Sequence, residues 1–202
     1  MTGVQTCALP ISILLRGVVE GDPDSQVRLA AILAYADVPS SASAGQAVYS
    51  WLAKDAWTAD PWLKDALAAA GARHDSGFVL DGLNRDRAQL SGPALEVVRI
   101  VVRHFAGAAP EASIEPTLAA LPAGGPSRAS AVLDGLIDGW PEERPPHLEA
   151  ARRQLIAELL RSLPDATAEK LLLLVHKWGH LGSFAPEVGS EEHTSELQSR
   201  GL

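Results

Sequence analysis

Apolar residues recur along the chain at positions i, i+3, i+4 and i+7, a spacing that lines one face of an α-helix. The pattern occurs five times, and its first positions are separated by 36, 35, 35 and 35 residues. One match is common in an apolar-rich sequence, but five in register indicate an internal repeat. The matching positions are Val27, Ala30, Ala31 and Ala34; Leu63, Ala66, Leu67 and Ala70; Val98, Val101, Val102 and Phe105; Leu133, Leu136, Ile137 and Trp140; and Ala168, Leu171, Leu172 and Val175.

Two of these repeats begin with the same helix-start signal, Asp22-Pro23 and Asp60-Pro61. An aspartate can accept hydrogen bonds from the free amides of the first turn. Proline at the first helical position loses no hydrogen bond, and its φ is already helical. The pattern therefore predicts capped helices that start at these two points.

Second helices are predicted between the repeated ones, at residues 44–53, 78–83, 114–121 and 147–160. Proline and glycine gather between the helical segments, for example at 122–126, where turns would join helix pairs. No comparable pattern of period two predicts strands. We therefore expect an all-α fold, an α-solenoid of about five helix pairs in which each pair buries its apolar face against its neighbours.

The helix-start segment 22–31 resembles the second-helix signature of HEAT-like repeats. Its matching residues are Asp22-Pro23-Asp24, Val27-Arg28 and Ala30-Ala31. With the segments 60–62, 133–139 and 171–179, the series resembles the HEAT-repeat region of large bacterial multidomain proteins. In those proteins a sugar-dehydrogenase-like β-propeller precedes the repeats and a c-type cytochrome domain follows them.

The resemblance implies an exported redox protein with haem attached at a Cys-x-x-Cys-His motif. This chain has no such motif, and its one cysteine is Cys7. Cofactors are therefore expected to be absent from this segment, and any haem would belong to the parent protein. What the resemblance implies for these residues is a spacer or docking segment between two other domains.

Both ends of the sequence look foreign to the repeat. A coding sequence for residues 3–11 can be written whose complementary strand, in a shifted frame, encodes residues 190–196. The pair resembles a sequencing-library adapter translated on both strands. We therefore expect residues 1–11 to be adapter-derived and residues 190–202 to be adapter-derived or a disordered tail. Residues 12–189 are then a HEAT-like fragment truncated at both ends.

The formal net charge of −8 makes nucleic acid an improbable partner, because phosphate binding favours clustered lysine and arginine. No apolar run approaches the roughly 18 residues of a membrane span, so none is predicted. The compartment is left open by the sequence.

Two pairs of residues have a spacing that is typical of a metal site or of a catalytic carboxylate pair. His176 and His180 are four apart and could share a metal on one helix face, but Gly179 is expected to end that helix and no third ligand is evident. Asp134 and Asp138 could act as paired carboxylates, but a solvated helix edge is the simpler interpretation. We assign no catalytic, cofactor or metal residue.

Five residues are candidates for contact with a partner. Arg28, Lys64 and Arg99 follow the first pattern position in successive repeats, where they would either face a partner or pair with acidic groups of neighbouring repeats. Trp57 and Trp62 lie near a turn between helices and are the tryptophans expected to be exposed, whereas Trp140 holds a core position.

Three functions are consistent with these features. The favoured one is a non-catalytic scaffold that binds a protein or neighbouring domains of the same parent chain. The second is a non-catalytic segment of an exported dehydrogenase and cytochrome c protein. The third is a HEAT-like DNA-binding enzyme, which the acidic charge disfavours.

Overall fold

The computed structural model describes residues 11–83 and 89–184, and these residues form helices and turns with no strand among them. The predicted all-α class is confirmed. The segments expected to be foreign, 1–11 and 190–202, lie outside the described residues except for Ile11, which begins the first helix.

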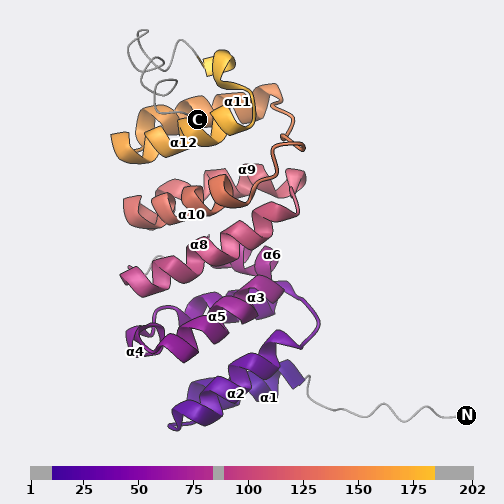
Figure 1. Ribbon diagram of the computed structural model, residues 1–202, viewed down its shortest axis with the longest axis vertical. Helices are drawn as coiled ribbons and strands as arrows, with labels where there is room; N and C mark the ends of the chain where they lie inside the picture. Colours follow the sequence, from indigo (N-terminus) through magenta and orange to yellow (C-terminus); the bar gives the residue numbers. More distant parts are fainter. Residues whose placement is uncertain (1–10, 84–88, 185–202) are drawn as a thin grey trace, which may run out of the picture.

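Five long helices correspond to the repeated apolar pattern and form one row in Figure 1, each packed on the next. They are α2 (Ser25–Ala36), α5 (Pro61–Arg73), α8 (Gly92–Gly107), α10 (Gly125–Gly139) and α12 (Asp165–Lys177).

A second set of helices packs beside that row. It comprises α1 (Ile11–Gly21), α3 (Ala42–Trp51), the short α6 (Asp75–Gly77) with the π-helix η1 (Phe78–Gly82), α9 (Glu111–Ala119) and α11 (Ala150–Ser162). Contacts run from α3 to η1, from η1 to α9 and from α9 to α11, so from α3 onward these helices also follow one another in space, while α1 packs on α2. Short elements complete the described chain: α4 (Asp55–Ala59) and the 3₁₀-helices η2 (Leu121–Gly124) and η3 (Leu181–Phe184).

The helix start at Asp60-Pro61 is as predicted. Asp60 is the N-cap of α5, and its carboxylate accepts hydrogen bonds from the amides of Trp62 (2.9 Å) and Leu63 (3.2 Å). The predicted start at Asp22-Pro23 is wrong by two residues. Asp24 caps α2 by accepting from the amide of Gln26, while Asp22 accepts from the amide of Asp24 and shapes the turn before the helix.

The repeated pattern identifies the buried face in four helices and misses it in one. All four pattern positions are buried in α5 and in α8; three of the four are buried at α10, and two of the four in α12, where Ala168 and Leu172 are half-buried. In α2 only Ala31 of the four is buried; the core residues there are Ala31, Ile32 and Tyr35. The prediction for α2 is wrong because burial depends on a neighbouring helix, and the pattern face of α2 has none among the described residues.

The second helices are found near their predicted places with shifted ends. The starts of α9 and α11 differ most, by three residues each: α9 begins at Glu111 rather than at 114, and α11 begins at Ala150 rather than at 147, because residues 141–149 form a linker. Two helices, α1 and α4, were not predicted. Both lack the Asp-Pro start, and α4 has only 5 residues, too few to show a helical period.

Candidate partner-binding surface

The most exposed large apolar side chain of the described residues is Trp62, in the first turn of α5, at 72 %. Its exposure follows from the helix register, because the next residue, Leu63, begins the buried face of α5. The preceding helix α4 packs on α5 and carries Trp57, which is only half-buried and rests against the core. Sequence reasoning was correct about the exposure of Trp62 and only partly correct about Trp57.

Arg28 lies over the indole of Trp57. Its guanidinium carbon is 4.6 Å from the ring centroid, within the range of a cation–π contact. The same guanidinium donates hydrogen bonds to the carbonyls of Asp22 (2.6 Å) and Val19 (3.3 Å). Arg28 therefore ties the end of α1 and the following turn to α4.

Lys64 and Arg99 are engaged in ion pairs between successive helices of the row. Lys64 Nζ donates to Glu96 Oε2 at 2.7 Å, and Arg99 lies 3.0 Å from Asp138 Oδ2. The hydrogen bond to Glu96 raises the pKa of Lys64. Of the two interpretations that the sequence left open, Lys64 and Arg99 therefore follow the second, in which they pair with acidic groups of neighbouring repeats instead of facing a partner.

Asp134 and Asp138 do not form a carboxylate pair, because each binds a cation on a different neighbouring helix. Asp138 pairs with Arg99 on α8, whereas Asp134 Oδ2 accepts from Lys170 Nζ on α12 at 2.6 Å. Lys170 also donates to the hydroxyl of Ser130 at 2.7 Å. The two carboxylates therefore join α8, α10 and α12. Together with Lys64–Glu96, they form three ion pairs between successive helices of the row, which we name the ion-pair ladder: Lys64–Glu96, Arg99–Asp138 and Lys170–Asp134.

His176 and His180 lie on either side of a helix end. Gly179 has φ +75°, and the amide of His180 donates to the carbonyl of Val175, which is the hydrogen bond of a Schellman C-cap. Gly179 thus ends the helix as predicted. Among residues 11–83 and 89–184, no group of three or more histidine, cysteine, aspartate or glutamate side chains is placed to hold a metal.

Sequence reasoning overlooked several buried polar side chains, among them His74 and Arg128. His74 is fully buried, and its Nε2 lies 3.0 Å from the carbonyl oxygen of Tyr35, so Nε2 carries the hydrogen. Arg128, 4 % exposed, donates to the Tyr49 hydroxyl at 2.8 Å from the first turns of α10. Neither residue belongs to a sequence motif, and their burial depends on helices far apart in the chain.

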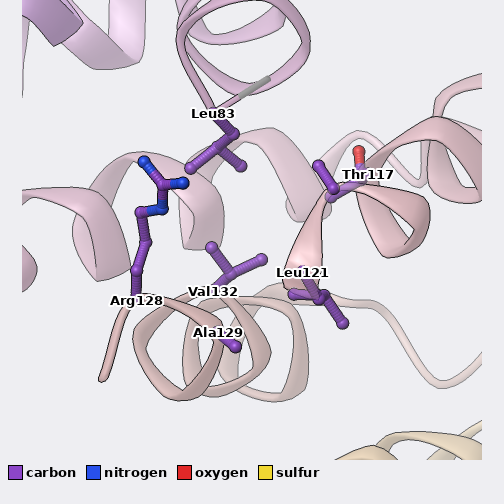
Figure 2. A pocket seen from close by; sticks show the side chains of 7 residues that line it. Leu83, Thr117, Leu121, Arg128, Ala129 and Val132 are labelled. Atoms are coloured by element: carbon purple, nitrogen blue, oxygen red, sulfur yellow. The ribbon is translucent and has the colours of Figure 1, made fainter. Parts of the chain in front are cut away.

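Arg128 stands among apolar side chains rather than in a ligand cavity. Figure 2 shows it rising from α10 beside Val132 and Leu83, with Thr117 and Leu121 on the opposite side. The space that these residues enclose has no room for a water molecule. We therefore assign Arg128 a structural role, in which it links α10 to α3 through the Tyr49 hydroxyl.

A more open groove of about 460 Å³ lies where the linker 141–149 passes α9. Arg144 donates to the carbonyl of Gly107 at 3.1 Å, and its own carbonyl accepts from Trp140 Nε1 at 2.8 Å. His147 donates to Glu111 Oε1 through both its amide and Nδ1, each at 2.8 Å. Arg144, Glu111 and His147 are thus engaged in holding the linker to the ends of α8 and α9.

No protein-family model, curated protein or solved structure matches this chain. The arguments about function therefore rest on the geometry above. In the described part of the chain, no helix combines the length and the apolar character needed to cross a bilayer.

The contact between Glu111 and His147 predicts a pH dependence of stability. The hydrogen bonds from the His147 amide and ring, in that order, lower the pKa of Glu111. A carboxyl group with a lowered pKa in the folded state stabilises the fold above its unfolded pKa and loses this contribution as the pH falls through the folded pKa. Glu111→Gln is expected to lower the melting temperature at pH 7, and this difference should close as the pH falls well below 4.5, the ordinary pKa.

Thermal melts of the two proteins followed by circular dichroism from pH 7 to pH 3 would measure this effect. Glu115→Gln, at an exposed position on the same helix, is the matched control and should show no such closing difference. A loss for Glu111→Gln that stays constant at every pH would contradict the proposed electrostatic cause.

Proposed function

We propose that the chain is a HEAT-like α-solenoid of about five helix pairs that acts as a protein-interaction or domain-spacing scaffold. Three observations support this. The apolar pattern repeats every 35 or 36 residues, successive pattern helices pack on one another, and a second helix accompanies each of them. Stacking of repeated helix pairs, each in contact with its neighbours, is the defining feature of solenoid proteins.

The observation that carries the binding function is the exposure of Trp62. Tryptophan is costly to leave in water and is enriched among residues that dominate the energy of protein interfaces. Most other tryptophans with described surroundings are buried: Trp51, Trp140 and Trp178 are all no more than 2 % exposed. Trp62 therefore has no evident packing role, and a partner that covers it would account for its position.

A protein is a better partner than a nucleic acid for this surface. The ion-pair ladder neutralises Lys64, Arg99 and Lys170 within the fold, so these cations are not available as a basic patch. The overall charge of −8 further opposes phosphate binding. The proposal assigns no catalytic residue and no cofactor to the chain.

Selection of random peptides displayed on phage against the purified chain tests this proposal without a known partner. Peptides that bind the Trp62 surface should lose affinity by about 30-fold or more for Trp62→Ala, since truncating a central interface tryptophan costs about 2 kcal/mol or more. The matched control is Ile100→Ala, which removes another exposed apolar side chain from the same row of helices. Selected peptides that bind both variants as tightly as the unchanged chain would refute a binding surface at Trp62.

A further inference from the structure

Three aspartates share the part of the surface where Trp62 is exposed. Asp60 directly precedes the helix and accepts the Trp62 amide at 2.9 Å. Asp65 follows Trp62 by three positions on α5 and is also exposed. Residues at this spacing are neighbours on a helix surface, with about 5–6 Å between their Cβ atoms. The preceding helix α4, which packs on α5, begins with the exposed Asp55. Trp62 therefore lies in an acidic part of the surface.

The fold itself does not neutralise these three carboxylates. The ion pairs between residues 11–83 and 89–184 include none of the three aspartates. The nearest cation along the helix, Lys64, is paired with Glu96 at 2.7 Å, and Arg28 is held by backbone carbonyls and the Trp57 ring. In residues 54–65 the remaining cation is Lys54. An excess of negative charge is therefore left beside the exposed indole.

This combination fits a positively charged side chain from a partner. The face of a tryptophan ring attracts a lysine or arginine cation, and nearby carboxylates attract the same group. The chain contains such a contact on the neighbouring helix, where the Arg28 guanidinium lies 4.6 Å from the Trp57 ring centroid. An acidic segment or a nucleic acid would instead set like charges against each other. The favoured occupant is therefore cationic.

The two terminal segments of this sequence do not have the required charge. Residues 1–10 contain no charged side chain, and residues 185–202 contain four glutamates and one arginine. A second copy of the chain would bring a formal net charge of −8 toward an acidic surface. Charge complementarity therefore favours a separate basic chain over either terminal segment or a second copy.

We propose that the partner of the Trp62 surface is a basic peptide segment, in which one lysine or arginine side chain lies over the Trp62 indole and a second pairs with Asp65. The inference rests on the proposed function, because it specifies the partner of that same surface. The contact is exposed, so added salt should weaken it: charges in solvent are screened over about 8 Å at 0.15 M ionic strength.

The probes for this inference are the phage-selected peptides that lose affinity for Trp62→Ala. They should carry a net positive charge. Fluorescence anisotropy of the labelled peptides at 0.15 M salt measures their dissociation constants. These should rise by about 3-fold for Asp65→Asn, which removes one exposed ion pair, and by about 10-fold or more for Asp65→Lys, which sets like charges together.

Asp165→Lys is the matched control. It makes the same change of charge at an exposed position in the first turn of α12, the last helix of the row. Screening by salt should keep its effect on the peptides below about 2-fold. Circular dichroism of each variant checks the helical fold, which should persist because Asp65 is exposed. Asp65→Asn keeps the size of the side chain and tests the charge even where Asp65→Lys fails to fold.

Each result decides the inference. Trp62-dependent peptides that are neutral or acidic overturn the basic partner but leave the Trp62 surface in place. The same holds for peptides that bind the Asp65 variants as tightly as the unchanged chain, or that Asp165→Lys weakens as much as Asp65→Lys. A selection in which no peptide depends on Trp62 overturns the proposed function and this inference together. The two failures are thus distinguishable.

Discussion

Trp140→Ala is expected to destabilise the fold by about 3–5 kcal/mol, the usual cost of truncating a buried aromatic side chain to alanine. Trp140 is 1 % exposed at the end of α10, and its ring meets Trp178 edge to face at 5.4 Å between centroids. Its Nε1 donates to the carbonyl of Arg144 at 2.8 Å. Alanine would leave a cavity between α10 and α12 and remove the hydrogen bond that holds the start of the linker.

Urea unfolding followed by helical circular dichroism measures the loss. Trp62→Ala is the matched control, because the same substitution at a 72 % exposed position removes little buried surface and should change stability by less than about 0.5 kcal/mol. Equal losses for the two variants would contradict the assignment of Trp140 to the core.

Gly139→Ala is expected to cost about 3 kcal/mol, although the same change in an open helix stabilises by up to about 1 kcal/mol. A Cβ atom at Gly139 would lie 2.2 Å from the carbonyl oxygen of Arg103 on α8. That oxygen belongs to the backbone, so no side chain can move aside. The helices α8 and α10 would have to separate along their contact, which would loosen the apolar side chains between them.

Gly107→Ala is the control for this prediction. Gly107 is the last residue of α8, as Gly139 is the last residue of α10. A Cβ atom there would be 3.9 Å from the Gly139 carbonyl oxygen, an ordinary contact distance. Thermal melts should show a large drop for Gly139→Ala and no drop for Gly107→Ala. Similar melting temperatures for the two variants would show that α8 and α10 do not approach as closely as described.

The predicted features that agree with the structure are mostly local in the chain. The cap at Asp60, the end of α12 at Gly179 and the buried faces of α5 and α8 each depend on residues within one or two helical turns. Trp140 was placed in the core because it completes the apolar pattern of its own helix. Such features are visible in a sequence because helical hydrogen bonds and periodicity join residues three to four apart.

The contacts of the candidate partner-binding residues, in contrast, depend on elements far apart in the chain. The sequence suggested Arg28, Lys64 and Arg99 as equivalent residues, yet Arg28 covers Trp57 while the other two enter the ion-pair ladder. The three residues do hold equivalent positions in the repeat, but their side-chain partners lie 29 to 39 residues away on other elements. The apolar pattern on α2 was predicted to be buried for the same reason, because the pattern of one helix does not show whether another helix covers it.

By itself the sequence determined that the chain is helical and where most of its long helices lie, since apolar spacing and capping residues act within a single helix. The tertiary structure alone decided which faces are covered and which charges meet. It brought Arg128 to Tyr49, which is 79 residues away, and left Trp62 exposed. The reason is physical: burial and pairing are properties of two surfaces in contact, and a pattern along one helix describes only one of them.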